Sequence, residues 1–493
     1  MEMIDDFGDV AELEGKHLCA ACIGETYLQA EVSRDGEPAE CSYCGGTARA
    51  YSLAVLADCI GQAFERHYTR TATEPDSVEQ SLLGDRELEY NWSRHGMPVV
   101  EAIEYAAGIP EEAAADVQRI LADRHANLDA YQMGDECEFD SESHYEEKEQ
   151  TDVLWQLEWQ EFERLLKTES RFFSAGAEAV LNSVFEGLDS LSTDKRKPLL
   201  VRAGPATRLK SVYRARVFLS EDKLQEALVR PDLSLGPPPS GCACDGRMNA
   251  RGVTVFYGAT NASVTIAEVR PPVGSRVLVG RFDIVRPLRL LDLTALEGVT
   301  QRGSIFDPSF AAALERAVFL RSLTARMTRP IMPGDEALDY LPTQAIADFL
   351  ATRTNAPLDG IIFPSVQSAR SGKNIVLFHR SSRVREMELP AGTKLEPHAW
   401  QVGDEGWKIS YGVTETVPSE VPPQPVRKGK GLGMLDDLLE SARDPLSSDL
   451  RSPALVVDTE SIYVYHVRAV DFRTEAERVS RHRVIAVNAK RSS

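Results

Sequence analysis

The 493-residue sequence lacks features that would assign it to several classes of protein. It contains no run of eighteen apolar residues, so we expect no transmembrane helix and no membrane partner. Its first residues, MEMIDDFGDVAELEG, are acidic and lack the basic and apolar regions of a secretory signal peptide. We therefore expect a cytoplasmic protein.

Basic residues are scarce in the first part of the chain. Residues 1–200 contain 43 acidic and 16 basic residues, a net charge of −27, whereas the remainder contains 33 acidic and 39 basic residues, a net charge of +6. One tract, GDECEFDSESHYEEKEQ at 134–150, is predicted to be an acidic loop or the lead-in to a helix. Because an acidic surface repels phosphates, we expect no nucleic-acid partner. The mildly basic remainder could hold a small anionic ligand.

Four of the eight cysteines form two close pairs. Two residues separate Cys19 from Cys22 and Cys41 from Cys44, and eighteen residues lie between the pairs. This spacing is typical of a zinc ribbon, in which each pair supplies two corners of a tetrahedron. Disulfides are disfavoured because nothing in the sequence indicates an oxidising compartment. We expect residues 1–50 to form a zinc ribbon around one structural Zn²⁺, with no open position for a catalytic water.

Residues 51–200 have the periodicity of helices. Apolar residues recur at helical spacing in TDVLWQLEWQEFERLLKTES and in AEAVLNSVFEGL, and the spacing of Trp155 and Trp159 favours packing in a core. The region resembles a HEPN-type all-α domain, in the version found before catalytic domains with a zinc ribbon. Arg119 and His125 fit the R-x4–6-H motif of HEPN ribonucleases. Chance matches are expected and the acidity disfavours RNA, so a helical scaffold or interaction module is the preferred interpretation.

Residues 205–395 alternate between strand-like and helical segments. SRVLVGRF, LRLLDL and GIIF are predicted strands, and PSFAAALERAVFLRSLTARM and TQAIADFLATRTN are predicted helices. In residues 396–493 a Pro- and Lys-rich linker, VPSEVPPQPVRKGKG, precedes a strand, IYVYHVRAVDF, which we expect to pair with the preceding sheet. The predicted fold is therefore multidomain: a small zinc ribbon, an all-α domain, an α+β domain and a β extension packed on it.

Four motifs in the α+β region occur in the order and spacing of one known family. They are VYRAR at 212–216, GRMN followed by Gly, Tyr and AEVR within 246–270, DGIIFPS at 359–365 and KNIVLF at 373–378. Together they resemble the RES family, named for its arginine, glutamate and serine, over about 190 residues. The resemblance implies a fold like that of ADP-ribosyltransferases and action on NAD⁺. Family members are mostly toxins of toxin–antitoxin pairs that deplete this cofactor.

The chemistry of NAD⁺ cleavage gives these residues roles. Breaking the nicotinamide–ribose bond builds positive charge on the ribose, which a carboxylate stabilises, and Glu268 is the candidate. Arg214 and Arg247 are candidates for binding the diphosphate, because guanidinium groups match phosphate oxygens bidentately. The Tyr257 ring can stack on the nicotinamide or adenine face. Arg247 and Tyr257 are counted with both the catalytic and the binding residues. Nicotinamide leaves as a neutral base, so neither a strong general acid nor a catalytic metal is needed.

Two further candidates supply neutral hydrogen bonds that orient the substrate. These are Ser365, counted with the catalytic residues, and Asn374, counted with the binding residues. Asn249 could bind ligand or make a turn. Arg216 could replace Arg214 at the diphosphate, since the two lie on the same face of one strand.

Several alternatives remain open at this point. The acceptor could be water or phosphate, which gives a glycohydrolase or a phosphorylase, or a cellular protein, which gives an ADP-ribosyltransferase. A HEPN ribonuclease and a non-catalytic scaffold are the alternatives from other classes. The resemblance implies an antitoxin or regulatory partner, and a homo-oligomer is left open. Cys242 and Cys244, directly before the GRMN motif, are expected to be small buried thiols.

Overall fold

A computed structural model of the chain describes residues 6–85, 90–332, 334–353, 356–368, 372–403, 406–418, 449–471, 474 and 476–482. All but the first two residues of the predicted Pro- and Lys-rich linker lie outside these ranges. The chain divides into two compact units. One, the amino-terminal unit, comprises residues 1–200 and 292–342, and the other, the sheet unit, comprises residues 201–291 and 343–493.

The amino-terminal unit begins with a small antiparallel sheet whose middle strand pairs with both others. Leu18 and Ala50 of this sheet are buried. Helix α2 begins where the Glu25 carboxylate accepts a hydrogen bond from the Leu28 N–H (2.7 Å), and it buries Leu28 and Val32 in the same core. The elements of this part are α1 (Asp6–Glu14), β1 (His17–Cys19), a 3₁₀ turn (Ala20–Cys22), α2 (Thr26–Asp35), β2 (Glu37–Glu40) and β3 (Thr47–Ser52).

The following part of this unit contains helices around an aromatic cluster. The Phe64 ring lies 4.4 to 5.7 Å from the rings of Tyr68, Phe139 and Tyr145. Burial of these large side chains supplies much of the hydrophobic stabilisation. The helices are α3 (Leu53–His67), α4 (Ser77–Gly84), α5 (Val99–Ala107), α6 (Glu111–Arg124) and α7 (Leu128–Met133).

The prediction of an all-α region at 51–200 is wrong, because a three-stranded sheet lies within it. Its strands are β4 (Tyr68–Arg70), β6 (His144–Glu147) and β5 (Met97–Pro98), with β6 in the middle. Strand β6 also replaces part of the predicted acidic loop. Strands of two to four residues are too short to show an alternating pattern, and they form only because the fold brings them together.

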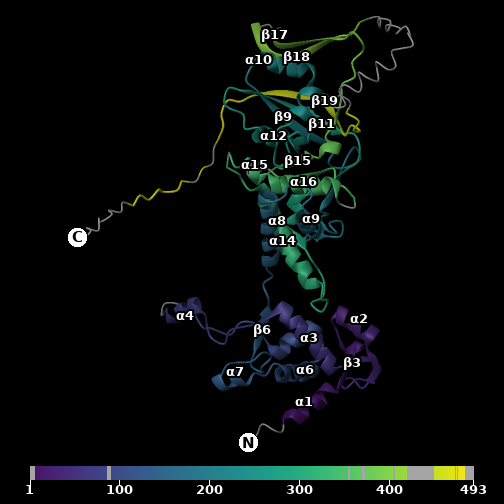
Figure 1. Ribbon diagram of the computed structural model, residues 1–493, viewed down its shortest axis with the longest axis vertical. Helices are drawn as coiled ribbons and strands as arrows, with labels where there is room; N and C mark the ends of the chain where they lie inside the picture. Colours follow the sequence, from purple (N-terminus) through teal and green to yellow (C-terminus); the bar gives the residue numbers. More distant parts are fainter. Residues whose placement is uncertain are drawn as a thin grey trace, which may run out of the picture. The chain divides into compact units, whose positions relative to one another are not determined.

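A helical bundle completes the amino-terminal unit. Trp155 and Trp159 pack on the ring of Phe319, at centroid distances of 5.8 and 5.4 Å, which confirms the prediction that these tryptophans lie in a core. Helices α8, α9 and α14 are labelled in Figure 1, where α8 lies beside both of the others. The elements are α8 (Val153–Thr168), α9 (Ala175–Phe185), β7 (Ser192–Thr193), α13 (Leu293–Leu296), β13 (Val299–Thr300), α14 (Phe310–Thr328) and α15 (Glu336–Asp339).

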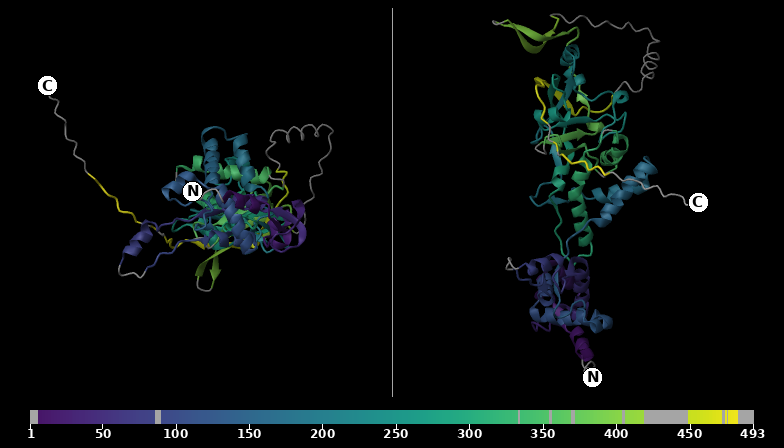
Figure 2. Two further views of the ribbon diagram at one scale, coloured as in Figure 1. Left: turned by 90° about the horizontal axis from the view of Figure 1, so that it is seen from below. Right: turned by 90° about the vertical axis from the view of Figure 1, so that its left-hand side faces the viewer.

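The sheet unit is organised around one nine-stranded mixed sheet. Strand β11 is buried along most of its length and pairs with β9 on one side and β19 on the other. Figure 2 shows the yellow strand β19 alongside the teal strands of this sheet. In sheet order the strands are β16 (Val384–Arg385), β19 (Leu455–His466), β11 (Arg276–Ile284), β9 (Ser211–Phe218), β10 (Phe256–Ala259), β15 (Lys373–Leu377), β14 (Gly360–Pro364), β12 (Leu288–Asp292) and β8 (Leu200–Ala203).

Helices cover both faces of this sheet. Helix α12 (Ala262–Glu268) packs over β9, β10, β11 and β15, so the end of the helix is held above the sheet. The remaining elements are α10 (Glu221–Val229), α11 (Pro231–Ser234), a 3₁₀ turn (Ser240–Cys242), α16 (Leu341–Thr352), a 3₁₀ turn (His379–Ser381), β17 (Lys394–Gly403) and β18 (Gly406–Thr416). The chain is therefore a multidomain α+β protein, and the predicted fold class is confirmed at this level.

Candidate functional site

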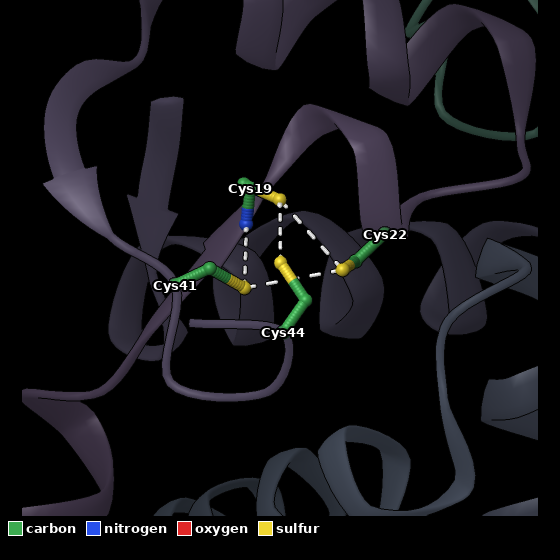
Figure 3. Close-up of side chains that lie close together, drawn as sticks. All are labelled: Cys19, Cys22, Cys41 and Cys44. Carbon is green, nitrogen blue, oxygen red and sulfur yellow. Dashed lines mark hydrogen bonds between the residues drawn. The ribbon is translucent and has the colours of Figure 1, made fainter. Parts of the chain in front are cut away.

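The four paired cysteines converge at one point of the amino-terminal unit (Figure 3). Their sulfur atoms all lie within 4.8 Å of one another. Cys19 Sγ lies 3.7 Å from Cys22 Sγ and 3.7 Å from Cys44 Sγ, and Cys41 Sγ lies 3.9 Å from Cys22 Sγ. A tetrahedron with zinc–sulfur bonds of ~2.3 Å has edges of about 3.8 Å, so these thiols fit a closed Zn²⁺ shell.

Backbone groups favour the thiolate of Cys41, whereas burial raises the pKa of Cys19 and Cys22 in the cluster without a metal. The Cys19 N–H donates to Cys41 Sγ at 3.4 Å. Burial alone would raise the pKa of Cys41, but backbone N–H groups of Cys19, Tyr43 and Cys44 outweigh it and lower this pKa to about 6. Since thiolates are the metal-binding form of cysteine, Cys41 is prepared for metal binding.

The sheet unit contains a cleft of about 320 Å³ over strands β9, β10 and β15. This volume lies within the range of small-molecule sites, roughly 300–1,000 Å³. Half of the lining residues were candidates from the sequence. The lining residues are Arg214, Ala215, Arg247, Tyr257, Gly258, Thr265, Glu268, Val269, Phe363 and Asn374.

Glu268 is the last residue of α12, and two neutral donors hold its carboxylate. Ser365 Oγ donates to Glu268 Oε1 at 2.6 Å, and Asn374 Nδ2 donates to the same oxygen at 2.8 Å. Both donors are buried, whereas Glu268 is exposed to the cleft. Among the residues that the structure describes, none donates a hydrogen bond to Glu268 Oε2, so this oxygen can receive one from a ligand.

Strands β14 and β15 bring the two donors together. In their antiparallel register Phe363 pairs with Asn374, and the Ser365 N–H donates to the Gly372 carbonyl at 2.9 Å just beyond the last pair. Asn374 also pairs with Ala259 of β10, which fixes it from the other side. Asn374 therefore lies within the sheet, and Ser365 directly follows strand β14, where its backbone is held by the Gly372 carbonyl.

Arg214 of β9 lies in the cleft with part of its charge unsatisfied. Its Cζ lies 4.9 Å from the centre of the Phe256 ring, and its Nη1 is buried without a hydrogen-bond partner among the described residues. Burial, with repulsion from Arg216, lowers the pKa of Arg214 to about 10. Arg216 is exposed, donates to the Ser234 carbonyl (2.8 Å) and does not line the cleft, so the geometry favours Arg214 as the anion-binding group.

Arg247 lies on a tight turn that other side chains brace. Tyr257 Oη donates to Asn249 Oδ1 (2.8 Å) and accepts from the Met248 N–H (3.0 Å). A Cβ on Gly246 would come within 2.7 Å of Asn249 Oδ1 and Tyr257 Oη, so only glycine fits this close approach. The bracing fixes the direction of the Tyr257 ring, which lines the cleft.

Asn249 serves the turn rather than the cleft. Its amide nitrogen donates to the carbonyls of Cys244 (2.9 Å) and Val253 (3.0 Å), and its side chain is buried and does not line the cleft. These contacts use both amide hydrogens. The structure therefore offers no geometry for the ligand contact that the sequence left open at Asn249.

The sequence did not indicate two residues that hold the turn from α16. Thr343 Oγ1 donates to the Arg247 carbonyl at 2.5 Å, and Gln344 Nε2 donates to the carbonyls of Gly246 (2.9 Å) and Asn249 (3.0 Å). Nothing in the local sequence marks these residues, because they act across almost a hundred positions. Phe363 also lines the cleft, and its place in the DGIIFPS motif was the only signal for it.

The two residues of the R-x4–6-H match do not form a recognisable site. Arg119 is exposed on α6, and the His125 ring packs 5.2 Å from the ring of Phe139. No comparison with known families supports a HEPN domain in this part of the chain.

Comparison with known families assigns the part of the chain that contains the cleft. The family model described as RES domain matches residues 212–400, and no curated protein or solved structure gives a significant match to the chain. In the part of the chain that the structure describes, no helix has the length and apolar character to cross a membrane. The cleft and its glutamate, serine and arginines all lie within the matched range. Residues 212–400 thus constitute a RES domain, of a family associated with toxins that degrade NAD⁺.

Proposed function

We propose that the cleft binds NAD⁺ and cleaves its nicotinamide–ribose bond, with water or phosphate as the acceptor. The observation that carries the proposal is the arrangement of the Glu268 carboxylate. Ser365 and Asn374 both donate to Oε1, and Oε2 accepts no hydrogen bond from the described residues, so it is available to a ligand. As the bond breaks, positive charge develops on the ribose, and a carboxylate fixed beside it stabilises that charge.

The remaining residues of the cleft suit the other parts of this substrate. Arg214 and Arg247 provide positive charge for the diphosphate, and Arg214 Nη1 needs a partner. The Tyr257 ring, fixed through its hydroxyl, offers a face on which a base can stack. Binding energy from these remote groups positions the reacting bond over Glu268.

The proposed step balances without a redox partner. The bond between ribose C1′ and the nicotinamide nitrogen breaks, and its electron pair leaves with neutral nicotinamide. Water then bonds to C1′ and releases a proton to solvent, which gives ADP-ribose, or phosphate bonds there and gives a phosphorylated ADP-ribose. Glu268 Oε2 can accept a hydrogen bond from the attacking water or from a ribose hydroxyl.

The amino-terminal unit has a structural role in this proposal. Cys19, Cys22, Cys41 and Cys44 would hold Zn²⁺, which cross-links the first strands of the unit and supplies folding energy rather than catalysis. We further propose, from the family association alone, that an antitoxin or other regulatory protein controls the activity.

The test is product analysis with matched variants. Purified full-length chain is incubated with NAD⁺, with and without phosphate, and the products are resolved by mass. We expect nicotinamide with ADP-ribose, or with phosphorylated ADP-ribose only when phosphate is present. The Glu268→Gln variant should lose at least about a hundredfold in rate, whereas Glu226→Gln, an exposed glutamate of α10, should behave as wild type.

Two results would count against the proposal. Wild-type turnover by Glu268→Gln with an unchanged melting temperature would exclude the carboxylate mechanism. Radiolabel from NAD⁺ retained on a cellular protein, without free ADP-ribose, would indicate ADP-ribosyl transfer instead.

A further inference from the structure

Cys242 and Cys244 are exposed on the loop that leads into the cleft. The sequence predicted two buried thiols here, and this prediction is wrong. Ala243 between them is the buried residue, which turns both neighbouring side chains toward solvent. Two accessible thiols one residue apart can be joined in a disulfide when the backbone brings their Cα atoms within about 7 Å.

The backbone of this thiol pair is bonded to the turn that carries Arg247. The Gly252 N–H donates to the Ala243 carbonyl at 2.9 Å, and Asn249 Nδ2 donates to the Cys244 carbonyl at 2.9 Å. Asn249 in turn accepts from the hydroxyl of Tyr257. A change at Cys244 therefore reaches Tyr257 of the cleft through two hydrogen bonds, by way of Asn249 on the turn that carries Arg247.

We propose that Cys242 and Cys244 form a redox modification site, which low-molecular-weight disulfides or peroxides oxidise to an intramolecular disulfide. With a disulfide oxidant such as oxidised glutathione, one thiolate attacks a glutathione sulfur and releases one glutathione. The second thiolate then attacks the mixed disulfide and releases the other. The two protein thiols lose two electrons, the oxidant gains them, and the two thiol protons end on two reduced glutathione molecules.

Other cysteines of the described chain are less suited to this reaction. Burial raises the pKa of Cys59 to about 11, which disfavours its reactive thiolate. Cys137 is partly buried, and its thiol donates to the Asn127 carbonyl at 3.8 Å. The four clustered cysteines would be ligands of a metal.

The disulfide would weaken the anion-binding side of the cleft. Closing a ring between residues 242 and 244 bends the backbone at Ala243, which turns its carbonyl and that of Cys244 away from their present donors. The turn then loses one hydrogen bond and the loop after it loses another, and Arg247 and Tyr257 lose their fixed positions. The effect on NAD⁺ turnover rests on the proposed function, whereas formation of the disulfide does not.

The first experiment measures the disulfide itself. Zinc-loaded full-length chain is equilibrated in glutathione buffers of increasing oxidation, blocked with an alkylating reagent and digested with trypsin. The tryptic peptide Leu224–Arg247 contains both thiols and no other cysteine. We expect the mass of this peptide to fall by two hydrogens and the peptide to escape alkylation. Dithiothreitol should reverse the change. A peptide that remains reduced, or that carries only separate glutathione adducts, would overturn the proposal.

The second experiment measures the consequence by a readout that does not need catalysis. Inorganic pyrophosphate binding is measured by calorimetry on the reduced and the oxidised chain. We expect about a tenfold loss of affinity on oxidation of wild type, since one hydrogen bond that holds the turn and one that holds the loop after it are lost. The double variant Cys242→Ser with Cys244→Ser should show no loss, and Cys59→Ser with Cys137→Ser should respond as wild type.

NAD⁺ turnover is then compared in the same samples. A fall of similar size on oxidation supports the proposal. If no sample turns over NAD⁺ but pyrophosphate binding still falls on oxidation, the redox site stands and the proposed function fails. Formation of the disulfide without any change in pyrophosphate affinity would overturn the link to the cleft.

Discussion

Ser365 Oγ lies 2.6 Å from Glu268 Oε1 and donates to it from a fully buried position. The hydroxyl cannot reach solvent, so its role is to orient the carboxylate. We predict that Ser365→Ala reduces kcat of NAD⁺ cleavage by roughly 10- to 100-fold with little change in KM. The free energy of unfolding should fall by only about 1 kcal/mol, as measured by urea denaturation. An equal rise in KM with unchanged kcat would instead indicate a ground-state contact.

In the proposed function, Arg214 binds the diphosphate at a cost to the stability of the free protein. Because burial lowers its pKa to about 10, well below the usual value of arginine, the folded state binds this proton more weakly than the unfolded state does. The charged side chain therefore destabilises the fold at every pH below about 10, and the penalty falls as the pH rises above this value. We predict that Arg214→Met weakens pyrophosphate binding while it increases the free energy of unfolding at pH 7, by roughly 1–3 kcal/mol.

Urea unfolding at about pH 7 and about pH 11 tests the predicted direction of this change in stability. The stability difference between Arg214→Met and wild type should shrink at the higher pH. Arg216→Met is the comparison variant, because Arg216 is exposed and lies two residues away on the same strand. It should give a smaller gain in stability, since it removes only the repulsion and leaves Arg214 buried. A loss of stability in Arg214→Met at neutral pH would contradict the argument.

The four-cysteine cluster should be essential for folding of the first strands. Cys19 and Cys41 are buried in the same core as Leu28 and Leu56. We predict one zinc per chain by elemental analysis, and we expect Cys41→Ser to lose it together with several kcal/mol of stability of the amino-terminal unit. Cys242→Ser should retain the zinc. Full zinc content and an unchanged melting temperature in Cys41→Ser would rule out the metal site.

Asn249→Ala separates a structural role from a ligand-binding role. Its buried amide makes the hydrogen bonds that hold the turn, so the variant should lose about 2–3 kcal/mol of stability as well as pyrophosphate affinity. Thermal unfolding measures the loss of stability, and calorimetry on the same sample measures the loss of pyrophosphate affinity. Reduced pyrophosphate binding at an unchanged melting temperature would indicate that Asn249 contacts the ligand directly.

The sequence was informative wherever chemistry fixes the spacing of residues. A tetrahedral thiolate site requires close pairs, so the spacing of Cys19, Cys22, Cys41 and Cys44 was enough to predict that they lie together. The motifs of the RES domain likewise pointed to Glu268, which lines one cleft with Arg247, Tyr257 and Asn374.

Features that depend on distant contacts could not be predicted. Strand β6 is too short to have a pattern of its own and exists because β4 and β5 flank it. Thr343 and Gln344 hold the Arg247 turn across the chain, and neither residue type in that place signals such a role. The exposure of Cys242 and Cys244 depends on burial of the small residue between them, which composition does not indicate.

The segment 292–342, although inside the sequence matched by the RES domain, forms a compact unit with residues 1–200. The Phe319 ring of this segment packs against the rings of both Trp155 and Trp159. During synthesis, strands β8, β9, β10, β11 and β12 therefore leave the ribosome before the amino-terminal unit can complete its core. Neither unit can therefore complete its folding before synthesis of the other has begun. A fragment that begins near residue 205 would contain α14 without the two tryptophans that cover it.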